Sequence, residues 1–513
     1  MDVVDMQQLS YEHLKNSGYM GYLVPQEAPE RVLQFGEGNF LRAFADRYFN
    51  QANEAGVWSG RVVLAQPRDA AKTGYAARNQ LNEQDCLYTV LVRGKGEDGK
   101  TVDTSEIVSC CSRCLNPSDS QDLASVMELA VSDDLEFIVS NTTEAGIVYD
   151  SSCTADEPWP ASFPAKLAQV LHARWKAQKS GPAILSCELI DHNGEELLRI
   201  VKRHCADWGW ETEFVDWLEQ ECTFCTTLVD SIVPGRIRDA NEAAAVAERL
   251  GYEDRFLAVR EPFQMWGIEG NESLAEKLPF IKAGLPGAFV TLDVTPYKRR
   301  KVRILNGAHT GFVPGAWLAG FDIVRDCMHD EVICGFMEHM LESEVIPTLS
   351  DELDHEDLEK FSKAVANRFD NPFIDHQLLS ICLNSCAKWR ARNLPSLVDY
   401  VAKNHEVPAC LATSLATLIG FYTTGLTSKG EDGLHLVRPD GTAYVAKDDE
   451  NILSFFEKHA TDSDADLVDA VMGEDGMWGH DLHKIAGLRD FVVERLGIVR
   501  KEGAHAAFQA CLL

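Results

Sequence analysis

A lysine, an asparagine and a histidine lie within a stretch that is otherwise mostly apolar or small, "KVRILNGAHTGFVP" at 301–314. On an α-helix that turns about 100 degrees per residue, Lys301, Asn306 and His309 would lie near roughly 0, 140 and 80 degrees, within half the circumference. The three side chains could therefore converge on one small substrate. A capped helix with a surface lysine and a core histidine is the plain structural alternative.

These residue types suit hydride transfer between a secondary alcohol and a ketone. Burial or neighbouring cations lower the pKa of a lysine from about 10.4, so Lys301 could exchange the hydroxyl proton near neutral pH. Asn306 and His309 could donate hydrogen bonds to the oxygen as charge develops on it, without a metal. The basic segment "KRRKVR" (298–303) could attract an anionic substrate or cofactor phosphates, or simply form a solvated helix start.

A glycine pair near the amino end could hold such a cofactor. The sequence "RVLQFGEGNFLRAFADRYFN" (31–50) reads as a strand, a tight turn and an amphipathic helix. Gly36 and Gly38 would let the turn approach a pyrophosphate, with Asn39 and Phe40 beside it. The third glycine of the usual dinucleotide fingerprint is replaced by Leu41, so a purely structural turn is the alternative.

Two further strand ends are candidates for the same site. The second strand ends "AQPRD", where Gln66 or Asp69 could bind the ribose of NAD and Arg68 could tolerate the phosphate of NADP. A later strand ends "FIVSNTTEAGI". Its polar residues would line a nicotinamide pocket or form an ordinary strand-to-helix turn; they are Asn141, Thr142 and Glu144.

The chain of 513 residues is too long for one hydrophobic core, so we expect two large domains. Short apolar runs alternate with amphipathic stretches at 121–131 and 161–178, which predicts an α/β, Rossmann-type, doubly wound, mostly parallel sheet over 1–290. Long helical patterns predict a mostly α-helical domain over 291–513. The apolar runs lie at 61–66, 87–94, 135–143 and 183–189; the helical patterns lie at 331–345, 356–367, 375–392 and 482–496; and a hairpin or surface loop is expected at 430–444.

The formal charge of −32 argues against nucleic-acid binding by phosphate neutralisation and favours small-molecule partners. The first residues, "MDVVDMQQLSYEHLKNSG", lack the features of a secretory signal, so a cytoplasmic protein is expected. The uncharged stretch at 407–426 reaches bilayer-spanning length, but its Pro, Gly, Ser and Thr residues favour a buried helix over a membrane span.

The fifteen cysteines are interpreted as reduced thiols, because the chain lacks an export signal. The clusters "CCSRC" (110–114) and "CTFC" (222–225) lack a second ligand pair at the spacing of a zinc site, so no metal is expected. No heptad or interface helix stands out, which leaves a monomer and a small homo-oligomer both open.

Long, ordered motifs resemble the mannitol dehydrogenase family of polyol-specific long-chain dehydrogenases. They are "QFGEGNFLRAF", "SNTTEAGI", "CELIDHNG", "FCTTLVDSIVP", "EPFQMWGIEG", "PYKRRKVRILNGAH" and "RFDNPFIDHQLLSI". Within the family, the likeness is strongest to members that act on keto-uronic acids. The resemblance implies an NAD-dependent, metal-independent oxidoreductase, with Lys301 as general acid or base and Asn306 and His309 holding the reacting oxygen.

The sequence departs from the family pattern at two positions. Many polyol-oxidising relatives have Asn at the position of Leu189, so Glu188, His192 or Asn193 could reshape the pocket there. Ser231 follows Asp230 where the family has Arg. The substrate-binding candidates from this part of the chain are Glu188 and Asp230.

A sugar-acid carboxylate would favour a bidentate cation, and Arg368 is the first candidate, with Asn371 and His376 nearby. A salt bridge from Arg368 to Asp370 is the structural alternative. The competing functions are a family member with another sugar substrate, an epimerase that retains NAD, and a sugar-acid sensor without catalysis.

Overall fold

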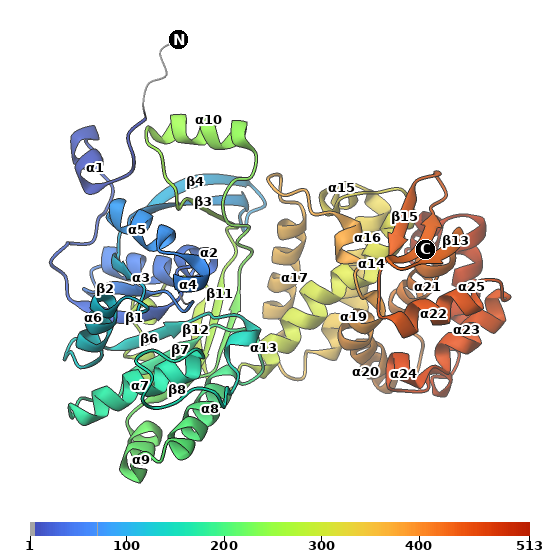
Figure 1. Cartoon of the computed structure of the whole chain (residues 1–513). Coiled ribbons are helices and arrows are strands. Elements are labelled where there is room, and N and C mark those ends of the chain that lie inside the picture. Colours follow the sequence, from blue (N-terminus) through green and yellow to red (C-terminus); the bar gives the residue numbers. More distant parts are fainter. Residues whose placement is uncertain (1–5, 69) are drawn as a thin grey trace. The chain divides into compact units, whose positions relative to one another are not determined.

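The computed structural model describes residues 6–68 and 70–513. The chain divides into two compact units (Figure 1). The first, here called the sheet unit, runs to Arg93 and continues over Val102–Val294; the second, the helical unit, comprises Gly94–Thr101 and Thr295–Leu513.

A six-stranded parallel sheet forms the centre of the sheet unit, in the order β5-β2-β1-β6-β7-β8. The chain builds outward from β1 in one direction and then returns to its other side at β6. Ligands of such sheets bind where the strand order reverses, outside the carboxyl ends of the strands. The strands are β1 (Glu30–Phe35), β2 (Arg61–Ala65), β5 (Cys111–Leu115), β6 (Phe137–Ser140), β7 (Ala183–Ser186) and β8 (Thr223–Cys225).

Alternate residues of these strands enter two separate cores, one on each face of the sheet. Val62 and Leu64 of β2 belong to one core, and Val63 to the other. Helix α3 (Ala45–Glu54) covers the first face, and α7 (Phe163–Lys176) and α8 (Asn193–Asp207) cover the second (Figure 1). The predicted doubly wound, Rossmann-type fold is confirmed.

The predicted strand at 87–94 exists as β3 (Tyr88–Lys95), but it lies outside the parallel sheet. It joins a three-stranded sheet with β4 (Thr101–Val108) and β10 (Ala258–Arg260). The connection to β4 is too short for the crossover that a parallel neighbour requires, so the chain folds back. A further sheet contains β9 (Thr227–Asp230), β11 (Met265–Glu269) and β12 (Ala288–Thr291).

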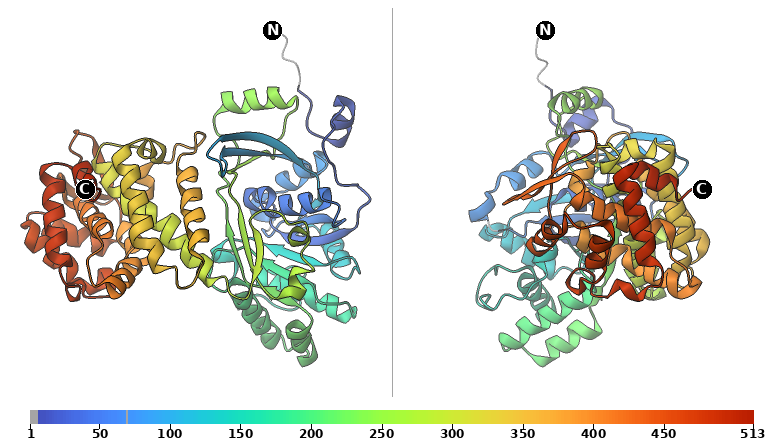
Figure 2. Two further views of the ribbon diagram at one scale, coloured as in Figure 1. Left: turned by 180° about the vertical axis from the view of Figure 1, so that it is seen from behind. Right: turned by 90° about the vertical axis from the view of Figure 1, so that its right-hand side faces the viewer.

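Helices dominate the helical unit, as predicted, and Figure 2 shows them in yellow to red from two further sides. The single helix expected at 375–392 is wrong. The left-handed backbone of Asn384 (φ 52°) separates the short α18 (Leu378–Ile381) from α19 (Ser385–Arg392). The segment near 430–444 forms three strands: β13 (Leu426–Gly430), β14 (Gly433–Val437) and β15 (Ala443–Ala446). The main helices are α13 (Thr295–Arg300), α14 (Gly307–Leu318), α16 (Glu331–His339), α17 (His355–Phe369), α20 (Leu394–Asn404), α21 (Ala409–Thr423), α25 (Leu488–Lys501) and α26 (Ala504–Gln509).

The uncharged stretch at 407–426 forms α21, a buried helix of 15 residues, which confirms the interpretation as a core helix. The described residues contain no helix long and apolar enough to cross a membrane. The buried amino end of α21 still needs hydrogen-bond acceptors. Glu344 provides them, because its two carboxylate oxygens accept bonds of 2.7 Å from the backbone N–H groups of Cys410 and Leu411.

Candidate functional site

The glycine turn after β1 requires glycine at its first position. Gly36 has φ +123°, a conformation that L side chains rarely adopt, and a Cβ there would lie 3.2 Å from Leu41 Cδ1. Gly38 is exposed, and no atom lies within 4 Å of the position that its Cβ would take. The turn therefore presents an open stretch of backbone at the carboxyl end of β1.

Buried polar side chains hold this turn through hydrogen bonds. Arg42 donates to the backbone oxygen of Glu37 at 2.6 Å, to Asn39 Oδ1 at 2.9 Å and to the backbone oxygen of Phe256 at 3.1 Å. Gln34 Nε2 donates to the backbone oxygen of Gly36 at 3.0 Å. Of the predicted residues, Asn39 thus has its side-chain oxygen engaged by Arg42.

Asp46 extends this network beneath the turn, and sequence reasoning missed it. Its Oδ2 accepts from Tyr88 at 2.8 Å and from Gln34 Nε2 at 3.4 Å. Burial raises the pKa of this carboxyl to about 6, against the opposing effect of the hydrogen bonds from Tyr88, Cys111 and Gln34. Gln34 thus links a buried acid directly to the glycine turn.

The carboxylate of Glu37, in the glycine turn, lies beside the end of β2, which the sequence pattern did not reveal. Gln66 is buried, and its Nε2 donates to Glu37 Oε1 at 2.8 Å while its Oε1 accepts from Asn116 at 2.9 Å. Glu37, the residue between the two glycines, thus lies where a ribose-binding acid is usual. Arg68 is exposed, and Asp69 lies outside the described residues.

The predicted segment at the end of β6 lies beside the glycine turn. Asn141 donates from its backbone N–H to the oxygen of Phe35 at 3.5 Å, and Glu144 begins a short 3₁₀ turn. Thr143 has φ 73°, which is an outlier for a β-branched residue. Such strained backbone gathers at functional sites.

Glu188 ties the end of β7 to this segment. Its Oε1 accepts from the N–H of Thr142 at 2.8 Å and from its hydroxyl at 3.1 Å, and its Oε2 accepts from Ser140 at 3.1 Å. The carboxyl is 1% exposed, and burial raises its pKa. Glu188, predicted as a substrate ligand, therefore has both oxygens engaged in bracing the end of β6.

The side-chain amide of Asn193 is also engaged, because it donates to the backbone oxygens of Ser186, Glu188 and Thr227.

The two departures from the family pattern have different surroundings. Leu189 is 62% exposed, which is unusual for a large apolar side chain. Asp230 is buried at the end of β9. The fully buried Arg260 of β10 donates to the hydroxyl of Ser231 at 3.3 Å, so a guanidinium from another sheet reaches the position where the family pattern has Arg.

In the helical unit, the stretch at 301–306 forms a π-helix, η2 (Lys301–Asn306), between α13 and α14. The N–H of Gly307 donates to the oxygen of Val302, five residues earlier. Because these hydrogen bonds join residues five apart instead of four, each residue of a π-helix turns by less than the 100 degrees of an α-helix. The angle of about 140 degrees expected between Lys301 and Asn306 on an α-helix is therefore wrong, and the π-turn brings them toward the same side.

His309 lies one turn further along, in α14. Its ring stacks on Phe369 at 3.9 Å and 16° between the planes, and meets His376 edge-on at 5.4 Å. Its buried Nε2 has no hydrogen-bond partner among the described residues. Burial, together with the nearby positive charges, lowers its pKa well below 6.5, so the imidazole is neutral at physiological pH.

Three cationic side chains surround His309, and two of them were missed. Arg368, Lys388 and Arg392 each contribute to lowering the His309 pKa. Lys388 and Arg392 are four residues apart on α19, an unfavourable spacing for like charges. Burial lowers the pKa of both; Lys388 donates to the backbone oxygen of Ile381 at 2.9 Å, and Arg392 donates to the Thr310 hydroxyl at 3.1 Å. Their spacing in "KWRAR" was the available signal.

Other predicted residues of this region have local partners. The Oδ1 of Asn371 accepts from the N–H of Phe373 at 2.9 Å. The Asp370 carboxylate pairs with Lys95 and, at 2.8 Å, with His329. His376 is exposed beside His309.

The basic segment at 298–303 is mostly neutralised within the helical unit. Arg299 pairs with Glu352, Arg300 with Asp357, and Arg303 with Asp399 at 2.6 Å. The three arginines thus have carboxylate partners within this unit, and the attraction of an anionic substrate or of cofactor phosphates stays a prediction. Lys298 is close enough to Lys301 for the latter's charge to help burial lower its pKa.

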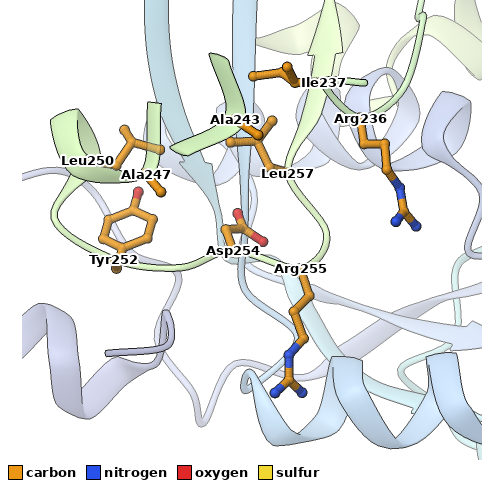
Figure 3. A pocket seen from close by; sticks show the side chains of 9 residues that line it. All are labelled: Arg236, Ile237, Ala243, Ala247, Leu250, Tyr252, Asp254, Arg255 and Leu257. Atoms are coloured by element: carbon orange, nitrogen blue, oxygen red, sulfur yellow. The ribbon is translucent and has the colours of Figure 1, made fainter. Parts of the chain in front are cut away.

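A cavity of about 210 Å³ lies beside α10 (Ala240–Leu250) (Figure 3). None of the predicted site residues lines it. Gly235, just before it in the chain, packs so closely that a Cβ there would lie 2.4 Å from Asn39 Nδ2. The wall of the cavity thus continues into the segment that supports the glycine turn. It is lined by Arg236, Ile237, Ala243, Ala247, Leu250, Tyr252, Asp254, Arg255 and Leu257.

No group of three or more His, Cys, Asp or Glu side chains in the described residues is arranged to hold a metal ion. All fifteen cysteines are free thiols, and thirteen of them are buried, as expected for structural thiols.

Comparison with known proteins relates this arrangement to one family. Residues 30–282 match the mannitol dehydrogenase Rossmann domain, and residues 293–497 match the mannitol dehydrogenase C-terminal domain. An altronate oxidoreductase from Halalkalibacterium halodurans is 39% identical over 519 residues, covering 99% of this chain and 98% of that protein. An altronate oxidoreductase from Escherichia coli O7:K1 is 39% identical over 489 residues, covering 93% of this chain and 96% of that protein.

Solved structures agree on the fold. A D-sorbitol dehydrogenase in substrate-free form has a TM-score of 0.76 at 21% identity, covering 94% of this chain and 96% of that one. Pseudomonas fluorescens mannitol 2-dehydrogenase, in a ternary complex with NAD and D-mannitol, has a TM-score of 0.65 at 20% identity, covering 99% of both chains. With both domains matched in order and near full-length relatives at this identity, the chain belongs to the mannitol dehydrogenase family.

Proposed function

We propose that this protein is an NAD-dependent oxidoreductase that interconverts D-tagaturonate and D-altronate in hexuronate catabolism. The altronate oxidoreductases that it resembles over nearly their whole length support the choice of substrate. The observation that carries the proposal is the group of cations around His309, in the same unit as Lys301. These positive charges would attract the carboxylate of a sugar acid.

The glycine turn fits the pyrophosphate of NAD. The positive φ of Gly36 and the open space at Gly38 leave the room that a side chain would fill. When bound, the nicotinamide ring supplies or accepts the hydride. The residues that would hold the cofactor are Gly36, Gly38, Asn39, Phe40, Gln66, Asn141, Thr142 and Glu144.

The carboxylate of Glu37 favours the binding of NAD over that of NADP. This carboxylate, held by Gln66 at the end of β2, could accept hydrogen bonds from the adenosine ribose. The same negative charge would repel the additional phosphate of NADP. The positive charge of Arg68, which is exposed after β2, would instead favour the additional phosphate of NADP.

In the reducing direction, Lys301 gives its proton to the ketone oxygen of the substrate. Asn306 and His309 donate hydrogen bonds to that oxygen while negative charge develops on it. A neutral imidazole has one N–H donor, and the low pKa of His309 ensures that it does not compete with Lys301 as the proton source. In the oxidising direction, Lys301 accepts the proton of the hydroxyl group.

Lys388 and Arg392, together with Arg368, bind the carboxylate at the other end of the substrate. A bidentate contact with a guanidinium would fix its orientation as well as its charge. Arg392 also donates to Thr310 at 3.1 Å, and the Thr310 hydroxyl donates to the backbone oxygen of Asn306 at 3.0 Å. Carboxylate binding is thus linked by two hydrogen bonds to the helix that holds the reacting oxygen.

A substrate panel tests the proposal. NADH absorbance is followed with purified protein and tagaturonate, fructuronate or fructose, and each reaction is repeated with NADPH. We expect the highest kcat/KM with tagaturonate and NADH, and one NADH consumed per altronate formed. Preference for fructose would contradict the carboxylate site, preference for fructuronate would move the assignment to that substrate, and turnover without net NADH consumption would indicate an epimerase.

Replacing Gly36 by alanine should weaken NADH binding. The φ of +123° and the 3.2 Å approach to Leu41 impose strain of about 1–3 kcal/mol, which the turn can relieve only by moving. We expect the Kd for NADH to rise about tenfold or more in a fluorescence titration. Gly56 also has positive φ (+70°) but nothing within 4 Å of its Cβ position. Gly56→Ala should therefore lower the melting temperature without changing the Kd, and equal affinities in the Gly36 variant and wild type would contradict the prediction.

A further inference from the structure

Two cysteines far apart in the sequence meet in the helical unit. Cys410 is the second residue of α21, and Cys511 follows α26. The two side chains interact, and each shifts the pKa of the other. Cys511 Sγ also contacts the first turn of α21, at 3.1 Å from Thr413 Oγ1 and 3.8 Å from the backbone oxygen of Ala409.

The two thiols differ in exposure and in proton affinity. Cys410 is buried, whereas Cys511 is partly exposed. The interaction with Cys511 raises the pKa of Cys410, which therefore remains a thiol. The same interaction lowers the pKa of Cys511, and Thr413 and Arg495 act in the same direction. The amino end of α21 adds a positive dipole near the sulfur.

Cys334 provides a contrast within the same protein. It is the other partly exposed cysteine, on α16. Burial and the negative charge of Glu338 raise its pKa to about 11, so it is a weak nucleophile. Exposure alone therefore does not distinguish Cys511; the pairing with Cys410 does.

We propose that Cys511 is a peroxide-reactive thiol and that Cys410 is its resolving partner. The Cys511 thiolate attacks hydrogen peroxide, the O–O bond breaks, and a sulfenic acid and hydroxide form. The Cys410 thiol then attacks the sulfenic sulfur, which yields a disulfide and one water molecule. The peroxide is the oxidant, and the two sulfur atoms together lose two electrons.

The disulfide would fix the segment after α26 to the start of α21. The adjoining helix α26 packs on the helix that carries His309, because a Cβ at Gly315 of α14 would lie 2.3 Å from Phe508 Cζ. The Phe508 ring also packs at a tilt against Phe336 of α16, with 4.2 Å between the ring centroids. Oxidation would therefore restrain a packing element of the α14 helix without altering Lys301, Asn306 or His309.

Peptide mapping of the full-length protein tests the proposal. The protein is treated with hydrogen peroxide, blocked with iodoacetamide and analysed by mass spectrometry. We expect a cross-linked peptide joining Cys410 and Cys511, two hydrogens lighter than the sum of its thiol peptides and lost on treatment with dithiothreitol. Cys334 should stay fully alkylated. Oxidation of Cys334 at an equal rate, or oxidation of Cys511 without the cross-link, would overturn the proposal.

Two measurements separate the roles of the two sulfurs. In Cys410→Ser, dimedone should trap a lasting sulfenic acid at Cys511, since no resolving thiol remains. The second measurement uses the wild-type protein, so misfolding of a variant cannot affect it. Iodoacetamide should alkylate Cys511 faster and at lower pH than Cys334. A Cys511 alkylation rate no higher than that of Cys334 would refute the assignment.

Discussion

Lys301→Ala lowers turnover of tagaturonate by about 10²–10⁴-fold, the usual contribution of a general acid or base. The substitution removes the proton source and leaves the glycine turn unchanged, since that turn belongs to the sheet unit. The Kd for NADH and the melting temperature should therefore remain close to the wild-type values. Initial rates from NADH absorbance, a fluorescence titration and thermal unfolding measure the three quantities.

Lys298 is the matched control for this variant. It lies one turn before Lys301 and is partly buried, and burial lowers its pKa. Lys298→Ala removes the same charge and should retain most of the activity. Addition of a small primary amine should partly restore turnover in Lys301→Ala, because the amine can occupy the space of the lost side chain and carry the proton. Wild-type turnover in Lys301→Ala would refute the mechanism.

Arg392→Met lowers kcat/KM for tagaturonate by about 10–100-fold, because a hydrogen bond to a charged group contributes about 1.5–3 kcal/mol. Methionine keeps much of the apolar stem while removing the guanidinium. The loss should be much smaller with fructose, which has no carboxylate. The decisive quantity is thus the ratio of kcat/KM for the sugar acid to that for the uncharged ketose, which general damage to the fold would not change.

Arg390→Met provides the control for charge on the same helix. Arg390 is exposed, two residues from Arg392, and is not among the groups with the largest effects on the pKa of His309. In Arg390→Met, the ratio of kcat/KM for tagaturonate to kcat/KM for fructose should equal that of the wild type. Lys388→Met should behave like Arg392→Met, with a smaller effect because an ammonium ion binds a carboxylate as a point charge. An unchanged ratio in Arg392→Met would contradict the carboxylate site.

Local patterns predicted the parallel sheet well. Strands such as β2 are short, apolar on both faces and bounded by turn residues, so neighbouring residues in the sequence determine their structure. The location of β3 could not be predicted in this way. Its partner β10 lies more than 150 residues later in the chain, and nothing within 87–94 specifies that pairing.

The candidate site was predicted in part. The spacing of Lys301, Asn306 and His309 indicated a common site, but an α-helical pattern does not reveal a π-turn, which depends on tertiary packing. Lys388 and Arg392 were missed because the predicted helix ran through Asn384, where the chain turns. Their convergence on His309 depends on packing between α14 and α19, which no local pattern encodes.

The π-helix at 301–306 is equivalent to an α-helix carrying one extra residue. Re-forming the same residues as a regular α-helix would rotate Lys301 by about 100 degrees relative to His309. The alignment of the reacting set is thus sensitive to the backbone hydrogen bonding of this segment as well as to its composition. In evolutionary terms, a π-turn absorbs the insertion of one codon, so a helix can gain a residue here while the helical turns on either side keep their alignment.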